Sequence, residues 1–366
     1  MRIINLSYNT NNQYHDPDIW LRRIAFFTGI LKSLAEFNDV ISIHFIDYEG
    51  ILRIDKVSNH FLRYRRWQLW LPIGFHRYLK RFHPDVVIVH GLIFPWQIIL
   101  LRCQLGRATR IVVQHHAERP LRWHRKYFQR KADSYVKAYL FASAELGRLW
   151  VDKGLIRSAS KIREVIGASS PFTPMDRKPA RLVTGVAGKP VFIWVGRLDK
   201  NKDPVTVVNA FRHFLTNHYQ SSLYMIFQTG ELLEALKAII SKYPDTEKAI
   251  HLMGKVDYHD LHYWYNSADF IISGSHYEGS GIAVCEAMSC GCIPVVTDIP
   301  SFRMMTRQGE CGMLYPPGDT DLLLAALTKS AEIDIETMKS KVLQQFNNKL
   351  SFAANAREYY DIFSAP

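Results

Sequence analysis

Two carboxylates stand eight residues apart in the stretch SHYEGSGIAVCEAMSCGCIPVV, at Glu278 and Glu286. An ionised carboxylate accepts strong hydrogen bonds, which suits the vicinal hydroxyls of a sugar. Gly279 and Gly281 lie between the two and favour a turn into a helix whose first amides can hold phosphate oxygens. The stretch therefore predicts one site in which anion binding and polyol binding are adjacent.

A second stretch, VGRLDKNKDPVTVVNAF, places two cations in a similar setting. Arg197 and Lys202 follow an apolar strand candidate and a glycine, and Asp203 and Pro204 then favour a helix start. Two fixed cations beside a helix N-terminus can hold a diphosphate and stabilise the charge that develops as it leaves. An ordinary basic loop is the alternative, but the spacing and the carboxylate stretch together favour a ligand site.

The elements that must position these residues alternate between short apolar runs and longer helical patterns, such as 203–218 and 320–330. This alternation predicts βαβ units and parallel sheets, whose ligands bind at the carboxyl ends of the strands. A stretch rich in proline and glycine, 169–190, predicts a linker between two such domains. The expected strands are 2–8, 40–47, 85–91, 110–116 and 138–143 before the linker, and 190–196, 222–230, 251–254, 269–275 and 293–298 after it.

The two site stretches closely resemble retaining glycosyltransferases of the GT-B fold, the large group 1 or family 4 type with a Glu-x7-Glu signature. The resemblance covers most of the second half and is weaker in the first. It implies an α/β protein of two Rossmann-like parallel-sheet domains facing a central cleft. These would be an N-terminal acceptor domain, 1–170, a nucleotide-sugar domain, 171–350, and a C-terminal helix, 351–366, that crosses back to the first domain.

The same resemblance implies a role for each residue of the predicted site. Arg197 and Lys202 would bind the diphosphate, Glu278 the hydroxyls of the transferred sugar and Glu286 the ribose. No metal and no cofactor would be needed, because the leaving phosphate takes the proton of the acceptor and the protein supplies positioning and charge. The other expected donor contacts are Gly279, Ser280, Gly281, Gly254 and Val256.

The first half carries fewer matches to the family. Its strand ending in VVQHHAERP supplies His116, or less favourably His115, as the amino-domain histidine near the sugar. A structural histidine is the alternative. The glycine pair that many relatives carry near the N-terminus is missing, and Asn9–Asn12 would take its place. Ser280 replaces a bulky residue of the Glu-Gly-x-Gly turn, which is expected to open space beside the sugar.

Two Asp-x-Asp patterns, 16–18 and 319–321, imitate a metal site of the other major glycosyltransferase fold. Both fit helix starts better, with the aspartate as the cap. Cys290 and Cys292 flank a glycine and lack partners for a metal. All five cysteines are therefore expected to be reduced thiols, which indicates a cytoplasmic protein.

The charge of the chain is unevenly distributed. Of 366 residues, 48% are hydrophobic and 22% charged, which is typical of globular proteins. Up to residue 175 there are 27 Lys and Arg against 13 Asp and Glu, an excess of +14, and the remaining 19 against 21 give −2. The start lacks the apolar core of a signal peptide, and no apolar run is long enough to span a membrane. A basic half of this kind attracts nucleic acid, an anionic membrane or a phosphorylated molecule.

One basic stretch, 53–81, mixes Lys and Arg with six aromatic residues. A surface helix pair whose aromatics belong to the core is one interpretation. A patch that meets anionic lipid is the other, with the protein peripheral on the inner face of the plasma membrane. Both stay open at this stage.

We expect a retaining hexosyltransferase that moves a sugar from a nucleotide diphosphate-sugar to a glycan or lipid-linked acceptor in cell-surface polysaccharide or glycolipid synthesis. A nucleotide-sugar epimerase of the same fold is one alternative, but both site stretches match the transferase pattern. A non-enzymatic RNA-binding protein is another, but no helix-turn-helix, zinc knuckle or RNA-recognition motif is present, so no nucleic-acid partner is expected.

Overall fold

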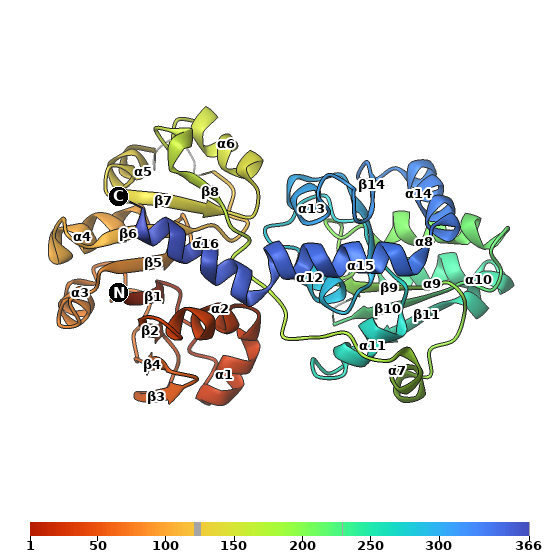
Figure 1. The fold of residues 1–366 in the computed structure, drawn as a ribbon, viewed down its shortest axis with the longest axis horizontal. Helices are drawn as coiled ribbons and strands as arrows, with labels where there is room; N and C mark the ends of the chain where they lie inside the picture. Colours follow the sequence, from red (N-terminus) through yellow and green to blue (C-terminus); the bar gives the residue numbers. More distant parts are fainter. Residues whose placement is uncertain (121–125, 229, 366) are drawn as a thin grey trace. The chain divides into compact units, whose positions relative to one another are not determined.

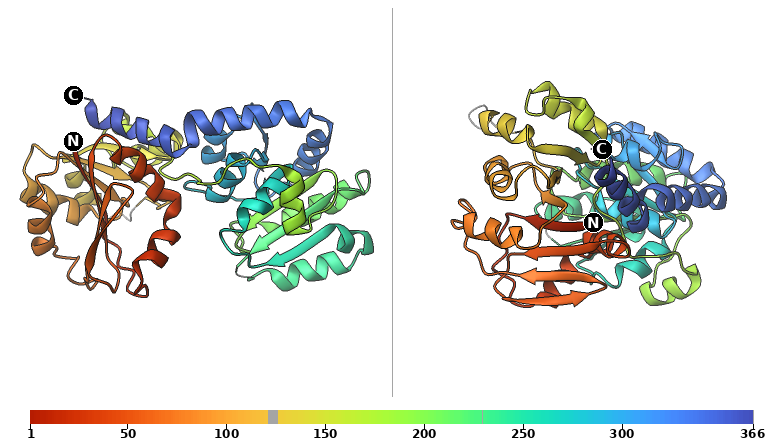
Figure 2. Two further views of the ribbon diagram at one scale, coloured as in Figure 1. Left: turned by 60° about the horizontal axis from the view of Figure 1, so that its bottom comes forward. Right: turned by 60° about the vertical axis from the view of Figure 1, so that its left-hand side comes forward.

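The computed structural model describes residues 1–120, 126–228 and 230–365. It divides into two compact units, each an α/β layer structure (Figures 1 and 2). The first unit consists of Met1–Ser169 with Phe352–Pro366, and the second of Ser170–Ser351. The linker prediction for 169–190 is wrong in part, because helix α7 (Arg177–Thr184) forms inside it. The guanidinium of Arg177 pairs with the buried Asp269 at 2.5 Å and ties this helix to the second unit.

The first unit contains an eight-stranded sheet in the order β3-β4-β2-β1-β5-β6-β7-β8. All neighbours in it are parallel except β3 and β4. Strands β2, β3 and β4 lie on one side of β1, and strands β5 to β8 follow one another on its other side. The strands are β1 (Arg2–Ser7), β2 (Asp39–His44), β3 (Gly50–Ile54), β4 (Val57–Phe61), β5 (Val86–His90), β6 (Arg110–Gln114), β7 (Val136–Phe141) and β8 (Ile162–Glu164).

The antiparallel pair β3–β4 was not predicted, and it corrects the helix pair proposed for 53–81. The two strands meet through a two-residue turn, Asp55 and Lys56, with φ of +49° and +65°. Positive φ at both positions is the geometry that joins twisted antiparallel strands, although Asn-Gly or Asp-Gly is its usual sequence. The stretch therefore begins as a hairpin, and only α3 (Ile73–Lys80) near its end is helical.

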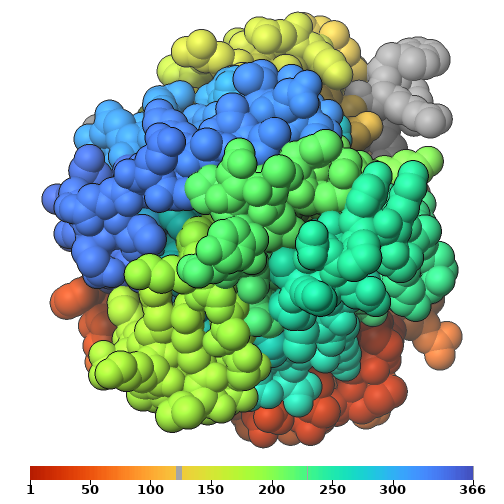
Figure 3. All heavy atoms as spheres, turned by 90° about the vertical axis from the view of Figure 1, so that its right-hand side faces the viewer, coloured from red at the N-terminus to blue at the C-terminus, as the bar shows by residue number. Residues whose placement is uncertain are grey.

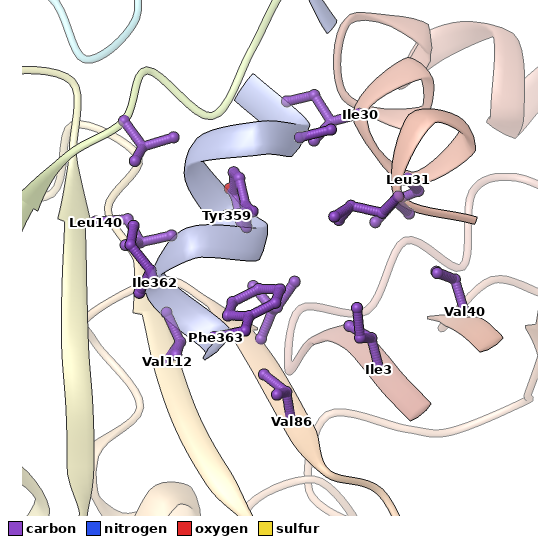
Figure 4. Packing of buried hydrophobic residues seen from close by; sticks show 14 of the residues in the cluster. Ile3, Ile30, Leu31, Val40, Val86, Val112, Leu140, Tyr359, Ile362 and Phe363 are labelled. Atoms are coloured by element: carbon purple, nitrogen blue, oxygen red, sulfur yellow. The ribbon is translucent and has the colours of Figure 1, made fainter. Parts of the chain in front are cut away.

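Helix α16 completes the core of the first unit from the far end of the sequence. Its Tyr359, Ile362 and Phe363 pack with buried residues of β1, β5, β6, β7 and α2 (Figure 4). The hydroxyl of Tyr359 donates to Gln114 Oε1 at 2.6 Å. The helices of this unit are α1 (Pro17–Arg23), α2 (Ala25–Ala35), α3, α4 (Pro95–Leu105), α5 (Lys126–Asp133), α6 (Ala144–Asp152) and α16 (Phe352–Ser364).

The second unit contains a six-stranded, wholly parallel sheet in the order β11-β10-β9-β12-β13-β14. Figure 3 shows one face of this unit, formed largely by α7 in lime green, α9 and α10 in teal and α14 in blue. The strands are β9 (Val191–Gly196), β10 (Ser222–Phe227), β11 (Ile250–Gly254), β12 (Phe270–Ser273), β13 (Ile293–Thr297) and β14 (Met313–Tyr315). The helices are α7, α8 (Pro204–Leu215), α9 (Leu233–Ser241), α10 (Pro244–Ala249), α11 (Leu261–Ser267), α12 (Ile282–Ser289), α13 (Pro300–Met305), α14 (Thr320–Glu332) and α15 (Ile335–Gln345).

Ten of the strands and both named helices lie where the sequence predicted them, which confirms the α/β class. The end of the predicted strand 222–230 includes Thr229, which lies outside the described residues. The two Asp-x-Asp patterns are helix caps, as expected: Asp16 accepts from the amides of Asp18 and Ile19, and Asp319 accepts from that of Leu322. Over the described part of the chain, no helix is both long and apolar enough to cross a bilayer.

Candidate active site

The site of the second unit lies where its chain reverses direction across the sheet. From β9 the chain moves through β10 to the edge strand β11, and it then returns to β12 on the opposite side of β9. In open α/β sheets, ligands bind at such a switch point, beyond the carboxyl ends of the two central strands. The loops that follow β9 and β12 carry the cations and the first carboxylate predicted from the sequence.

The structure joins Lys202 and Glu278 across these two loops. The ammonium of Lys202 pairs with Glu278 Oε1, which also accepts a hydrogen bond from Ser275 Oγ at 2.7 Å. The side chains of Lys202 and Glu278 are 22% and 14% exposed. The carboxylate is therefore held in place by two donors and remains accessible to a ligand.

Arg197 behaves differently from Lys202. It leaves β9 with its side chain 66% exposed and pairs with Asp199 at 3.0 Å. The carboxylate of Asp199 also accepts from the amide of Lys202 at 3.0 Å and so shapes the cationic loop. Arg197 is thus anchored at the rim of this loop, and no direct contact joins it to Glu278.

A glycine allows the two loops to come this close. A Cβ atom at Gly274 would lie 2.9 Å from the carbonyl oxygen of Asp203 and 3.1 Å from that of Lys202. Further contacts fasten the loops together. The amide of His276 donates to the carbonyl of Asn201 at 2.8 Å, and the Asn201 side chain donates to the carbonyl of Tyr277 at 3.1 Å.

Asp203 has two tasks in this arrangement. It adopts φ of +42° and caps α8 by accepting from the amide of Thr206 at 3.2 Å. Its other carboxylate oxygen lies 3.2 Å from His276 Nε2. The sequence predicted the cap and missed Asn201, Ser275 and His276. Their position in the loops that follow strands β9 and β12 was the available signal.

The turn at Glu278 leads into α12 as predicted. Gly281 has φ of +55°, and a Cβ atom there would lie 2.6 Å from the ring of Phe302. No side chain caps the N-terminus of α12. Its first amides are therefore suited to an anion, because unsatisfied N–H groups and the helix dipole both favour negative charge. Ser301 Oγ fixes the turn by donating to the carbonyl of Glu278 at 2.7 Å.

Glu286, in the second turn of α12, faces an aromatic group instead of the cations. Its side chain is only 4% exposed, and the hydroxyl of Tyr265 on α11 donates to Oε2 at 3.0 Å. Burial raises the pKa of this carboxyl to about 7, although the hydrogen bond from Tyr265 lowers it. Phe172 packs against Tyr265 and stacks on His262, with ring centroids 6.1 and 5.6 Å apart.

The other predicted donor contacts are spread along the carboxyl edge of the same sheet. Gly279 and Ser280 lie in the turn between Glu278 and α12. Gly254 ends β11 with φ of +72°, and Val256 is half-buried in the loop that follows. The strand order places β11 two positions from β9. Gly254 and Val256 could therefore meet only the end of a long ligand that lies away from Lys202 and Glu278.

In the first unit, the exposed His116 ends a chain of polar side chains whose other members, Asn5 on β1 and His90 at the end of β5, are buried. His90 Nε2 lies 2.5 Å from Asn5 Oδ1, and His90 Nδ1 lies 2.6 Å from His116 Nε2. Because the Asn5 oxygen can only accept, His90 donates to it and accepts from His116. Burial lowers the pKa of His90 well below its ordinary value, so the ring is neutral. Desolvation also lowers the pKa of His116, so this ring is neutral too, and with Nε2 donating to His90 its Nδ1 is an acceptor.

The neighbouring histidine has a structural environment. His115 is 2% exposed, packs on Phe141 with ring centroids 4.7 Å apart, and lies 2.9 Å from the carbonyl of Glu118 through Nε2. His116 is exposed, and its amide donates to Glu118 Oε2 at 2.7 Å. Of the two candidates, only His116 can meet a ligand. The sequence missed Asn5, His90 and Glu118 as its partners.

No group of three or more His, Cys, Asp or Glu side chains within 1–120, 126–228 and 230–365 is arranged to hold a metal ion. The cysteines of the second unit are buried, and burial raises the pKa of the Cys290 thiol to about 12. The Cys290 thiol is therefore not a reactive nucleophile at neutral pH.

Comparison with known proteins finds a family match within the second unit. Residues 178–342 match the family model described as Glycosyl transferases group 1. This part of the chain is similar to that family, which confirms the resemblance found in the sequence. The match ends within the second unit and contains Arg197, Lys202, Glu278 and Glu286.

Two curated relatives extend the comparison. The chain is 26% identical over 238 residues to a GDP-mannose:cellobiosyl-diphosphopolyprenol alpha-mannosyltransferase of Xanthomonas campestris, with 62% of this chain and 59% of the relative covered. It is 26% identical over 152 residues to the UDP-Gal:alpha-D-GlcNAc-diphosphoundecaprenol alpha-1,3-galactosyltransferase of Escherichia coli, covering 41% of this chain and 39% of the relative. The matches thus span between two fifths and three fifths of these relatives.

A solved structure covers nearly the whole chain. A glycosyltransferase from Rickettsia africae has a TM-score of 0.76 and 14% identity, with 99% of this chain and 97% of the other covered. At this level of identity the likeness shows the fold alone. It confirms the predicted GT-B fold.

Proposed function

We propose that the protein is a retaining glycosyltransferase that moves a hexose-type sugar from a nucleotide diphosphate-sugar to a glycan or lipid-linked acceptor. The observation that carries the proposal is the Lys202–Glu278 pair at the switch point between β9 and β12, beside the uncapped start of α12. One group there suits phosphate and the other suits sugar hydroxyls, so the two halves of a nucleotide-sugar fit adjacent groups.

Each charged residue has one task in this proposal. Arg197, Lys202 and the first amides of α12 hold the diphosphate and stabilise the charge it gains as it leaves. Glu278 orients the hydroxyls of the sugar, and Glu286 accepts from the ribose hydroxyls. The proton of the acceptor hydroxyl passes to the departing phosphate on the same face of the sugar, so the configuration is retained and no protein base is required.

The acceptor is proposed from the relatives and from the charge of the first half. The names of the Xanthomonas and Escherichia relatives give cellobiosyl-diphosphopolyprenol and GlcNAc-diphosphoundecaprenol, which are sugars linked to a lipid diphosphate. An excess of +14 before residue 176 would attract the same kind of molecule and an anionic bilayer that carries it. We therefore place the enzyme in the cytoplasm, peripheral on the inner face of the plasma membrane, in polysaccharide or glycolipid synthesis.

A panel of UDP-, GDP- and ADP-sugars tests the donor. A nucleotide-sugar that binds the folded state raises the melting temperature, and the one that does so should also be hydrolysed or transferred. Lys202→Ala should reduce the shift, whereas Lys200→Ala, a change of an exposed lysine in the same loop, should leave it intact. If no nucleotide-sugar binds, or if both variants bind equally, the proposal is wrong.

Metal independence belongs to the same proposal, because the charge of the diphosphate is met by Arg197, Lys202 and the α12 amides. Activity should persist in EDTA. A complete loss that magnesium restores would contradict it.

A further inference from the structure

A phenol hydroxyl without a partner is buried beside Glu286, and the proposed function gives it no task. It belongs to Tyr258, in the turn between β11 and α11. Over residues 1–120, 126–228 and 230–365, nothing forms a hydrogen bond with the Tyr258 hydroxyl. A buried polar atom that stays unpaired costs free energy, so each one in a folded protein requires an explanation.

The position of Tyr258 is set by its backbone and by one aromatic neighbour. The carbonyl of Tyr258 accepts from the amide of Leu261 at 3.3 Å, where α11 begins. Phe172 packs against the Tyr258 ring with centroids 5.1 Å apart and stacks on His262 on its way along the chain. Phe172 is half-buried, and the residues on either side of it are exposed. The phenol is therefore held near α11 and packs against a side chain at the edge of the unit.

Glu286 lies next to this phenol. Burial, and after it the charge of Glu286, raise the pKa of Tyr258, so the carboxylate is near the hydroxyl. Of these two described side chains, neither completes a hydrogen bond to the other. Tyr265 by contrast donates to Glu286 Oε2 at 3.0 Å. Two phenols thus flank one carboxylate, and the protein itself uses only that of Tyr265.

The donors and acceptors of these groups define what fits between them. An ionised carboxylate can only accept, so a ligand hydroxyl at Glu286 must donate to it. The oxygen of that hydroxyl then has lone pairs that require a donor, and the Tyr258 phenol is an unused donor at this place. A ligand hydroxyl between the two side chains satisfies both, whereas a C–H group there leaves the phenol unpaired.

We propose that Tyr258 is a specificity-determining residue of the nucleotide site, which donates to the ribose hydroxyl bound by Glu286 and so selects ribonucleotides over deoxyribonucleotides. The inference rests on the proposed function, which places the ribose at Glu286, and it adds the residue that recognises the hydroxyl. The ribose reaches the phenol by displacing the half-buried ring of Phe172.

Calorimetric titration at pH 8, above the pKa of about 7 of Glu286, tests the proposal. UDP, GDP and ADP are titrated first, and the one that binds most tightly is compared with its 2′-deoxy and 3′-deoxy forms. In the wild type, removal of the recognised hydroxyl should weaken binding by more than about tenfold, because two hydrogen bonds are lost. Tyr258→Phe should weaken the ribonucleotide by about tenfold and change that deoxynucleotide by less than about twofold.

Two further variants show whether the Tyr258 hydroxyl has only a structural role. Tyr219→Phe removes the hydroxyl of a residue of the same unit that is 79% exposed, and it should change no affinity. Tyr258→Phe removes an unpaired hydroxyl, so the free energy of unfolding without nucleotide should stay the same or rise. Tyr265→Phe removes a hydrogen bond to Glu286 and should lower it. A loss of stability in Tyr258→Phe, with all three nucleotides weakened alike, would overturn the proposal.

The outcomes keep this inference separate from the proposed function. If none of UDP, GDP and ADP binds, the proposed function fails and this inference fails with it. If one of them binds, but Tyr258→Phe changes its affinity and those of both deoxy forms by the same factor or not at all, only the role of Tyr258 fails. A ribonucleotide that is weakened while one deoxy form is unchanged establishes that role.

Discussion

The two units place different chemistry at the same topological position. In the second unit, the switch point between β9 and β12 is charged, and the Lys202–Glu278 pair joins the two loops that follow these strands. In the first, the switch point between β1 and β5 borders a cavity with aromatic residues in its lining, and the buried pair Asn5 and His90 beside it is neutral. A parallel sheet fixes where a ligand binds, whereas the loop residues decide which ligand it is.

The largest expected effect is an opposite response of the two units to pH. Burial lowers the pKa of His44 to about 4 and of His76 to about 3, both in the first unit. The unfolded chain binds these protons more readily, so stability is lost as pH falls below about 6.5. Between pH 7 and 5, each histidine should remove about 2 kcal/mol from the free energy of unfolding of this unit.

Glu286 should act in the other direction in the second unit. Its pKa is raised to about 7, so the folded state holds the proton more tightly and its contribution falls as pH rises from the unfolded value towards 7. Hydrogen exchange at pH 5 and 7, corrected for intrinsic rates, reports each unit separately. Glu286→Gln should remove this trend from the second unit only. A uniform response of both units would contradict the assignment.

The next effect concerns the cations. Arg197→Ala and Lys202→Ala should each lower turnover by about ten- to a hundredfold, since a lost charge-assisted hydrogen bond costs about 1.5–3 kcal/mol. The free energy of unfolding, measured with urea, should change by less than the free energy that corresponds to the loss of turnover. Turnover at the wild-type rate in both variants would remove these residues from the site, and Lys200→Ala serves as the matched control.

The two carboxylates should separate sugar recognition from ribose recognition. Glu278 is bound to Lys202 and Ser275, whereas Glu286 lies under Tyr265, so they face different parts of a ligand. Glu278→Gln should keep the affinity for the bare nucleoside diphosphate and impair transfer. Glu286→Gln should lower the affinity for the nucleoside diphosphate itself. Calorimetry that finds the same loss in both variants would contradict the division of roles.

The smallest effect is expected on the surface of the first unit. Binding to anionic liposomes should fall with salt and weaken when Arg63, Arg65 and Arg66 are replaced by Ser, because each exposed cation near such a surface contributes about 1 kcal/mol. Arg63 should contribute least, since Asp47 already pairs with it. Neutral liposomes are the control. If the protein does not bind anionic liposomes at low salt, this stretch does not hold it at a membrane.

The sequence predicted regular elements well where pattern and capping agreed. Helix α8 follows from Asp203 and Pro204 with an apolar stripe behind them, and β12 from its β-branched run. The hairpin β3–β4 was missed because Asp55 and Lys56 form its turn without a glycine. Helix α7 was missed because it lies within a stretch, 169–190, whose prolines and glycines are typical of a linker. The helix is held by Arg177, which pairs with Asp269 far along the chain.

The sequence by itself determined the identity and spacing of the charged groups, Glu278 eight residues before Glu286 and Arg197 five before Lys202. These are local properties, since a strand, a glycine turn and a helix start place them. Only the tertiary structure decided that Lys202 meets Glu278 while Arg197 meets Asp199, because that choice depends on the approach of two loops across Gly274.

The same holds for the basic aromatic stretch. The composition of a stretch does not say which of its aromatic side chains are buried. The spacing of the aromatic residues does not say so either, because this stretch changes from strand to turn to helix and no single period applies. Packing against the sheet buried Phe61 and Phe75 and left Trp67 and Trp70 exposed beside the cavity. Burial is a property of long-range contacts, and so this division was settled by the fold.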